Sequence, residues 1–203
     1  MIKTNVMKIL EQKKIKYDFF EYDPTTTDGM LVAASLNENP NQVFKTLVTT
    51  DSANHYFVFV IPVNQTLDLK KVAKIVGKKS IDMIKQKELE PLTGYIHGGC
   101  SPIGMKKKIV TYFDKSIENF DAIFVSAGRV GVQIKIAVKD LIKITLDYSL
   151  LKPIKIRMEN YHFFDVEEIF DTQVHIQGQI KEDEYSAFTK EIFEFSNGRI
   201  IIE

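Results

Sequence analysis

The chain has 203 residues, of which 44% are hydrophobic and 27% are charged, and its formal net charge is zero. This composition is typical of a globular protein and excludes a disordered one, and no apolar run approaches the ~20 residues of a membrane-spanning helix. A single cysteine excludes an internal disulfide, and the first residues lack the apolar core of a signal peptide, so we expect a cytoplasmic protein.

Patterns in the first third of the chain predict a helix, a strand, a second helix and a hairpin. Apolar side chains recur at helical spacing over residues 3–14, and residues 17–22 are rich in aromatic side chains, which favours a strand. A loop with helix-start residues precedes a short predicted helix at 29–36. Residues 43–50 and 55–63 are β-branched and aromatic, and the short polar segment between them predicts a β-hairpin.

Lys45 lies inside the first strand of this hairpin, between large apolar neighbours. Alternation along the strand sends its side chain to the face opposite Phe44 and Thr46. A lysine on the inner face of a sheet is costly unless it is paired or used in function. Position alone favours the simpler alternative, an outward lysine on a half-exposed strand.

The next segment predicts a helix with a basic flank. Residues 68–76 place apolar side chains on one face, and Asp68 or Thr66 can cap this helix. A strand over 80–84 and a helical turn over 86–90 follow. The lysines of the basic flank are Lys70, Lys71, Lys74, Lys78 and Lys79.

The stretch from Thr93 to Gly104 holds four glycines and one proline in twelve residues. Because glycine costs backbone entropy in helices and strands and proline removes a donor, the stretch predicts a loop. Bare backbone N–H groups in such a loop can approach a carbonyl, carboxylate or phosphate oxygen of a ligand. The alternative is a tight turn whose role is packing alone.

Three lysines, Lys106, Lys107 and Lys108, follow this loop directly and precede a predicted strand at 109–113. Beside a ligand-binding loop, they predict contacts to the phosphates of a nucleic acid. An isolated basic triplet is also typical of a solvated surface, and the sequence leaves that alternative open.

Two further strands are predicted at 121–126 and 132–137, joined by a segment with two glycines, and a helix is predicted at 138–144. The tight return leaves Ser126 at a strand end, where functional side chains are often found. Strands scattered among short helices predict a mixed α+β fold around a curved or barrel-like sheet, and not a doubly wound parallel sheet.

Beyond Tyr148 the charge balance reverses. Residues 1–148 carry 21 basic and 16 acidic side chains, a net charge of +5, whereas residues 149–203 carry 6 and 11, a net charge of −5. We therefore expect two domains, one at 1–148 and a small acidic α+β extension at 149–203 whose role stays uncertain. A basic surface on the first domain speeds the approach of a polyanion such as RNA, although a solvated surface explains +5 equally well.

Patterns in the extension predict the order strand, short helix, strand, helix, strand, without a catalytic constellation. The predicted ranges are a strand at 150–158, a short acidic helix near 165–170, a strand at 172–180, a helix at 182–194 and a strand at 199–202.

Several short motifs occur together in one order over three-quarters of the chain. They are Val43–Leu47, Leu67–Ala73, Thr93–Tyr95 with Gly98–Gly104, and Val125–Gly128. In these motifs, residues 1 to about 148 resemble the YbaK/EbsC-type aminoacyl-tRNA deacylases, free-standing relatives of the editing insertion of bacterial prolyl-tRNA synthetase.

The resemblance implies a six- to seven-stranded mixed barrel-like sheet with flanking helices, and hydrolysis of the ester between an amino acid and the 3′ end of tRNA. It implies that Lys45 binds the ribose–phosphate end of the substrate, that Gly99 lies in the loop that contacts the ester, and that Ser126 lines the pocket; these are the expected catalytic residues. The expected substrate-binding residues are Tyr22, Gly98, Cys100, Ser101 and Gln133, and the expected tRNA-binding residues are Lys106, Lys107 and Lys108.

Two positions depart from the family pattern. Many members carry Asp where this chain has Gln133, and some carry Phe where this chain has Asp28 before Gly29. Both departures bear on the amino acid that is accepted and leave the fold unchanged.

No Ser–His–Asp or Cys–His set is visible, and there is no zinc-ligand spacing or nucleotide-binding glycine motif, so we expect neither a metal nor a cofactor. In Cys-specific relatives, the thiol of the substrate is thought to attack its own carbonyl, while the protein orients the substrate and stabilises the oxyanion. Cys100 as an enzyme nucleophile is the less favoured alternative because it has no assigned base; a small buried filler is the favoured role.

The resulting hypothesis is a trans-editing hydrolase that cleaves the ester of mischarged aminoacyl-tRNA, with Cys-tRNA(Pro) or Cys-tRNA(Cys) as its substrate. One alternative is a non-catalytic module that binds aminoacyl-tRNA or a synthetase, and another is an interaction protein whose extension is the active part. The expected partners are aminoacyl-tRNA and prolyl-tRNA synthetase, with no membrane and no DNA.

Overall fold

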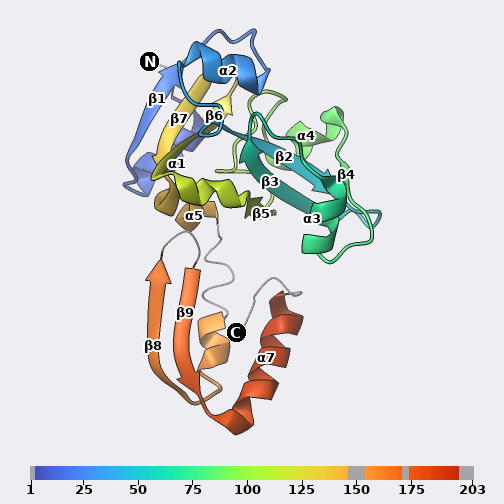
Figure 1. Cartoon of the computed structure of the whole chain (residues 1–203), viewed down its shortest axis with the longest axis vertical. Coiled ribbons are helices and arrows are strands. Elements are labelled where there is room, and N and C mark those ends of the chain that lie inside the picture. The colour runs from blue at the N-terminus through green and yellow to red at the C-terminus, as the bar shows by residue number, and fades with distance from the viewer. Residues whose placement is uncertain (1–2, 146–153, 171–173, 197–203) are drawn as a thin grey trace. The chain divides into compact units, whose positions relative to one another are not determined.

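The structure is a computed structural model, and it describes residues 3–145, 154–170 and 174–196. The chain divides into two compact units, Met1–Leu141 and Ile142–Glu203, and each is described here by itself. The mixture of helices and strands in Figure 1 confirms the predicted α+β class. None of the helices in these ranges has the length and apolar character needed to cross a membrane.

The first sheet of the larger unit has the strand order β1-β7-β6, with both pairings antiparallel. Its strands are β1 (Tyr17–Glu21), β6 (Ala122–Arg129) and β7 (Val132–Ala137). Helix α1 (Asn5–Gln12) contacts β6 and buries Val6 and Leu10 completely. Thr4 accepts a hydrogen bond from a backbone N–H of the first turn and so fixes the start of this helix.

The second sheet has the order β4-β2-β3-β5. Its strands are β2 (Phe44–Thr50), β3 (Tyr56–Pro62), β4 (Asp82–Met83) and β5 (Val110–Phe113). Strands β2 and β3 form the predicted antiparallel hairpin, and β5 joins β3 in parallel. A parallel bridge between Val43 and Phe124 connects the two sheets. Within the described residues the sheets do not close into a barrel, so barrel-like closure stays a prediction.

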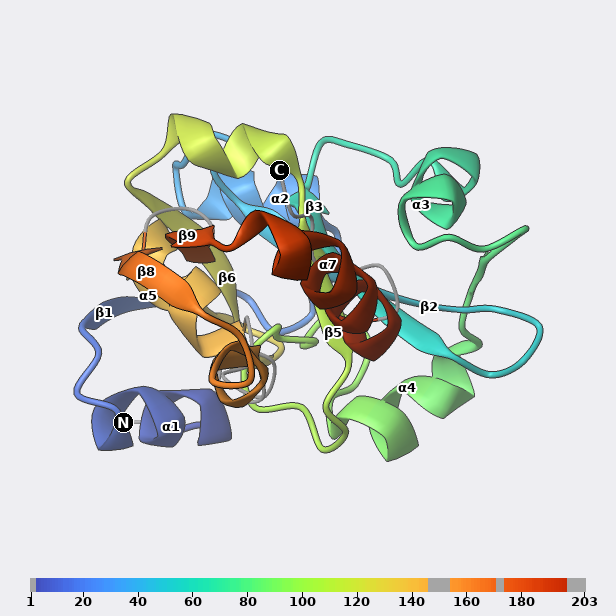
Figure 2. The same cartoon turned by 90° about the horizontal axis from the view of Figure 1, so that it is seen from below.

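Short helices flank these sheets. They are α2 (Gly29–Ser35), α3 (Leu69–Ile75), α4 (Gln86–Thr93) and α5 (Val138–Thr145), with a 3-10 helix at Lys115–Asn119. The carboxylates of Asp28 and Asp68 each accept two backbone N–H groups at 2.9–3.0 Å and cap α2 and α3. Of the two caps predicted for the middle helix, the structure uses Asp68. Figures 1 and 2 show α1 and β1 at one side of the unit and α3 and α4 at the other.

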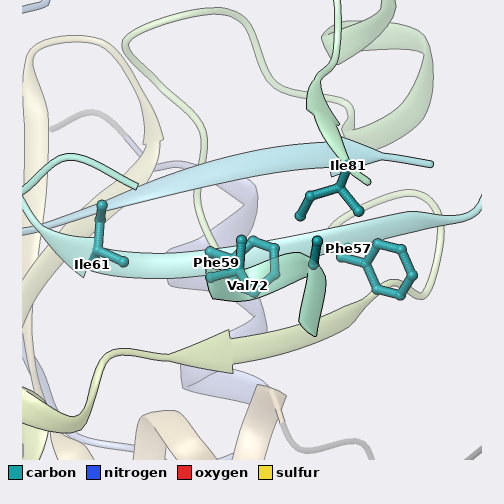
Figure 3. Packing of buried hydrophobic residues seen from close by; sticks show 6 residues of the cluster. Phe57, Phe59, Ile61, Val72 and Ile81 are labelled. Atoms are coloured by element: carbon teal, nitrogen blue, oxygen red, sulfur yellow. The ribbon is translucent and has the colours of Figure 1, made fainter. Parts of the chain in front are cut away.

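A buried cluster holds α3 against the hairpin. Figure 3 shows Phe57, Phe59 and Ile61 of β3 beside Val72 of α3 and Ile81, all of them buried. The three β3 residues alternate along the strand and therefore share one face, and Val58 and Val60 on the other face are buried as well. This cluster fixes the hairpin on which Lys45 lies.

The second unit contains an antiparallel hairpin and a long helix (Figure 1). The elements are β8 (Phe163–Phe170), β9 (Val174–Ile180), α7 (Glu182–Ser196) and a short helix at 154–158. Phe188 of α7 packs edge-on against Tyr161 and Phe163, with ring centroids 5.2 and 4.8 Å apart.

Two predictions for this unit were wrong. Residues 154–158 form a helix within the range predicted as a strand, and the acidic segment 165–170, predicted as a helix, belongs to β8. Pairing with β9 and packing of Phe163 on α7 outweigh the local preference of acidic residues, because strand preference depends mainly on such contacts. The strand predicted at 199–202 lies outside the described residues.

Candidate functional site

Lys45 lies half-buried on β2 between two apolar clusters. Its neighbour Val43 belongs to one cluster, and Leu47 packs against the other. Lys45 Nζ donates a hydrogen bond to the carbonyl oxygen of Val63 at 3.0 Å. Burial lowers the pKa of Lys45, and the negative charge of Asp28 partly opposes this effect. Because Lys45 is partly removed from water, its charge interacts more strongly with an anionic group than the charge of a fully solvated lysine does.

The start of α2 packs against the carbonyl acceptor of Lys45. A Cβ atom at Gly29 would lie 2.6 Å from Val63 Cγ1, so the helix approaches Val63 at a distance that only glycine permits. Asp28, which caps this helix, is also the carboxylate whose charge acts on Lys45. One residue therefore fixes the helix start and influences the lysine.

Ser126 and Gln133 are direct partners across β6 and β7. They are 7% and 6% exposed, and Ser126 Oγ accepts a hydrogen bond from Gly128 N at 3.2 Å. Gln133 Oε1 is buried and has no hydrogen-bond partner among the described residues. Because a buried amide oxygen without a donor is costly, this oxygen can accept a donor from a ligand.

The bridge between Val43 and Phe124 relates Lys45 to Ser126. The two strands run in parallel there, and Lys45 and Ser126 each lie two residues beyond the bridged pair. Side chains two residues apart on a strand share a face, so both belong to the face of Val43 and Phe124, which pack in one cluster. The predicted lysine and serine therefore lie on the same face where the two sheets meet.

The tip of the glycine loop packs against two segments, the one just before α2 and the turn between β6 and β7. Gly98 has φ +79°, and a Cβ atom there would lie 2.7 Å from Thr27 Cγ2, in the segment just before α2. A Cβ atom at Gly99 would lie 3.0 Å from Val130 N, in the turn between β6 and β7. The loop is thus fixed between the segment that carries Asp28 and the turn that follows Ser126.

Two backbone donors at the loop tip are available for a ligand. The N–H of Gly99 donates to the carbonyl of Ile96 at 3.0 Å, whereas the N–H groups of Gly98 and Cys100 make no backbone hydrogen bond in the described part of the chain. Backbone donors two residues apart in one loop can stabilise an oxyanion.

Cys100 and Ser101 are held inside the loop. Burial raises the pKa of the Cys100 thiol to about 12, and a hydrogen bond with the side chain of Thr93 opposes this only in part. Ser101 is completely buried, and its Oγ accepts a hydrogen bond from Ile103 N at 3.3 Å. Since nucleophilic attack requires a thiolate, this environment does not suit a nucleophilic cysteine.

Tyr22 is joined to the turn between β6 and β7, and the lysine triplet directly follows the glycine loop. Tyr22 N donates to Gly131 O at 2.9 Å, which ties the end of β1 to the turn between β6 and β7. Lys106 N donates to Thr93 O at 2.9 Å and closes the neck of the glycine loop. Lys107 Nζ lies 5.9 Å from the ring of Tyr56, beside the hairpin turn, and Lys108 is exposed.

The structure thus packs the loop tip against the Thr27–Asp28 segment and the β6–β7 turn, and it places Lys106 and Lys107 at the neck of the loop. Sequence reasoning missed the role of Thr27 and Asp28 between the loop and Lys45. The one available signal was an aspartate directly before a glycine at a helix start, which predicts a cap and nothing about a distant lysine. Within the described part of the chain, no group of three or more His, Cys, Asp or Glu side chains is placed to hold a metal ion.

Two family models match this chain, one over each part of it. Residues 24–144 match the family model described as an aminoacyl-tRNA editing domain, and residues 144–199 match that of a domain of unknown function, DUF1949. EbsC of Enterococcus faecalis, which carries the provisional name Cys-tRNA(Pro)/Cys-tRNA(Cys) deacylase, is 45% identical over 147 residues, covering 70% of this chain and 88% of that protein.

Two solved structures share the fold. The hypothetical protein APE2540 has a TM-score of 0.64 at 22% identity over 69% of this chain and 93% of its own. A provisionally assigned trans-editing enzyme for prolyl tRNA synthetase has a TM-score of 0.62 at 20% identity over 71% and 94%. At these identities the likeness shows the fold alone.

Proposed function

The chain belongs to the aminoacyl-tRNA editing domain family, and on that premise we propose that this deacylase clears Cys-tRNA(Pro) or Cys-tRNA(Cys) in trans. The name of its 45% identical relative EbsC supports this choice of substrate. The observation that carries the assignment of the site is the packing of the glycine loop against the Thr27–Asp28 segment, because Asp28 is the charge that acts on Lys45.

In the proposed site Lys45 binds the ribose–phosphate end of the tRNA. When substrate enters, a phosphate oxygen takes the place of Val63 O as the hydrogen-bond partner of Nζ. The ammonium donor makes both hydrogen bonds charge-assisted, but only the phosphate also carries an opposite charge, so the exchange is favourable in a partly buried site. The ester then lies toward the glycine loop.

The loop supplies the electrostatic part of catalysis. The N–H groups of Gly98 and Cys100 point to the role of an oxyanion hole, since neither donates to the backbone within the described ranges. Ser126 and Gln133 bind the aminoacyl group, with Gln133 Oε1 accepting a donor that the ligand brings. Removing one oxyanion donor typically lowers a rate by about 10²–10³.

The nucleophile comes from the substrate or from water. The thiol of the cysteinyl group attacks its own carbonyl carbon, the ester C–O bond breaks, the 3′ oxygen leaves with a proton, and water then opens the cyclic thioester. Cys100 takes no part, because its raised pKa keeps it as a thiol near neutral pH.

We also propose a location, a partner, an arrangement of the sheets and a domain organisation. We propose a cytoplasmic protein that meets prolyl-tRNA synthetase and shares tRNA with it, and a barrel-like arrangement of the two sheets across the Val43–Phe124 bridge. Residues 1–148 form the deacylase domain, and residues 149–203 form an acidic extension that matches a domain of unknown function.

A deacylation panel tests this function. We expect ester loss from Cys-tRNA(Pro) or Cys-tRNA(Cys), slower loss from Ala-tRNA(Pro), and no catalysed loss with Lys45→Ala. Lys16→Ala is the matched control, because Lys16 is an exposed lysine at the edge of β1 in the same unit. Wild-type protein that binds tRNA tightly without turnover would instead indicate a non-catalytic binding module.

A further inference from the structure

A cluster of charged side chains lies at the turn of the β2–β3 hairpin, away from Lys45. Lys78 Nζ lies 3.0 Å from Asp51 Oδ2, and His55 Nδ1 lies 2.7 Å from the same oxygen. Lys78 Nζ also lies 3.3 Å from His55 Nδ1. We name Asp51, His55, Tyr56, Lys78 and Lys107 the hairpin-turn cluster.

Asp51 makes this cluster rigid. The residue is 9% exposed, and its Oδ1 accepts hydrogen bonds from Ala53 N at 2.9 Å and from His55 N at 2.8 Å. Burial by itself raises the pKa of Asp51, but hydrogen bonds from His55, Lys78 and the turn backbone outweigh it and hold the pKa below its ordinary value. The carboxylate therefore stays charged and positions the ammonium group of Lys78 and the ring of His55.

Lys107 extends the cluster across the hairpin. Its Nζ lies 5.9 Å from the ring centroid of Tyr56, which directly follows His55. Lys107 and Lys79 are exposed, whereas Lys78 is half-buried. Lys78 and Lys107 carry two positive charges against the one negative charge of Asp51, and the ring of Tyr56 lies beside Lys107. Positive charge with an aromatic ring is the combination that binds single-stranded nucleic acid.

The distance along β2 from Lys45 to Asp51 matches the length of a nucleic-acid strand that contacts both Lys45 and the hairpin-turn cluster. Strand β2 runs from Phe44 to Thr50, and Asp51 lies six positions after Lys45. At ~3.3 Å per residue this is about 20 Å along the strand, which is roughly six times the ~3.4 Å spacing of stacked nucleotides in one strand.

We propose that the hairpin-turn cluster binds the sugar–phosphate backbone of the substrate tRNA several nucleotides away from its aminoacyl end. This inference rests on the proposed function, which places that end at Lys45. An acidic protein surface is the competing partner, and the experiment separates the two because a protein-binding cluster would leave the tRNA kinetics unchanged.

The experiment compares two substrates with full-length protein. Lys107→Ala and Lys78→Gln each remove one positive charge, and the amide of the second variant retains a donor for Asp51. With Cys-tRNA(Pro) we expect each to raise KM about three- to fivefold with kcat unchanged, as for one exposed phosphate contact. With the cysteinyl ester of adenosine, which is too short to reach the cluster, we expect no change in kcat/KM.

Salt dependence gives a second readout. Each variant is expected to reduce the slope of log KM against log salt concentration for Cys-tRNA(Pro) by roughly 1. Lys16→Ala is the control and should leave both the slope and KM as in wild type. Equal effects of the Lys107 and Lys78 variants on the tRNA and on the adenosine ester would overturn the inference, and so would an unchanged tRNA KM.

The failures of the two proposals are distinguishable. Wild-type protein that hydrolyses neither substrate would overturn the proposed function. Wild-type protein that hydrolyses both, with variants that retain the wild-type KM and salt slope for tRNA, would overturn only the inference about the hairpin-turn cluster.

Discussion

At the scale of single residues, the site depends on a cation whose proton is held less tightly than usual. Burial lowers the pKa of Lys45 below that of a lysine in water, and the negative charge of Asp28 raises it in part. A lysine with a lowered pKa loses its charge at a lower pH than a lysine in water, so the proposed contact to the ribose–phosphate end is lost as the pH rises. The lowered pKa of Lys45 can be tested with Asp28→Asn, because this variant removes the charge at position 28 and keeps a side chain that caps α2.

We expect kcat/KM, corrected for spontaneous ester hydrolysis, to fall as pH rises, with an apparent pKa below the 10.5 of free lysine. Asp28→Asn should move this alkaline limb to lower pH, because asparagine caps a helix about as well as aspartate but carries no charge. Asp68→Asn is the matched control: Asp68 caps α3 with the same two hydrogen bonds. A limb that does not move with Asp28→Asn, or moves equally with Asp68→Asn, contradicts the assignment.

Cys100 gives a second prediction at this scale. Its thiol has a pKa of about 12 because it is buried, so it is neutral near pH 7. Cys100→Ala should keep deacylation within about threefold of wild type and lower stability by about 1 kcal/mol, as for loss of a small buried group. Kinetics with Cys-tRNA(Pro) and thermal unfolding check both. A folded Cys100→Ala variant that has lost ~100-fold or more in kcat would require a chemical role for the thiol.

At the scale of elements, the glycine loop is placed by close approach and not by flexibility. Gly98 and Gly77 both have a positive φ, +79° and +66°. A Cβ atom at Gly98 meets Thr27, whereas a Cβ atom at Gly77 meets nothing within 4 Å. A substitution at either glycine strains the backbone, but only a substitution at Gly98 also disturbs the packing of the loop on the segment before α2.

Gly98→Ala should lower kcat by about 10-fold or more, because displacing the loop moves the proposed oxyanion donors. Gly77→Ala should cost about 1–2 kcal/mol of stability through the same left-handed backbone and leave kcat unchanged. Kinetics at a temperature where both variants are folded provide the measurement. Equal effects on kcat would mean that loop packing against Thr27 has no part in catalysis.

At the scale of the whole molecule, all the proposed site residues lie in the unit Met1–Leu141, and the second unit matches a separate family model. The charge split of +5 and −5 follows nearly the same division. Like charge on the tRNA and on the extension argues against direct RNA binding by residues 149–203. The chemistry should therefore be independent of the extension.

Deleting residues 149–203 should leave kcat/KM for Cys-tRNA(Pro) within about threefold of wild type, because α5 and its buried Leu141 remain in place. Circular dichroism controls for folding. A folded truncated protein that has lost turnover would assign a catalytic role to the extension, in agreement with the hypothesis that the extension is the active part.

How far the sequence predicts this protein depends on the range of the interactions concerned. The hairpin of β2 and β3 and the cap at Asp68 were predictable because alternation and capping are set by neighbours in the chain. Strand β8 was mispredicted because its acidic residues favour other structures locally, while pairing with β9 decides the outcome.

The sequence by itself determined the α+β class, the strand that carries Lys45 and the presence of a glycine loop, since each follows from local spacing and backbone freedom. Only the tertiary structure decided that Lys45 turns inward to Val63 O, that Asp28 is its counter-charge and that the loop tip packs on Thr27. Burial and Coulomb interactions between residues 17 to 71 positions apart have no signature in a single sequence, because they depend on which segments the fold brings together.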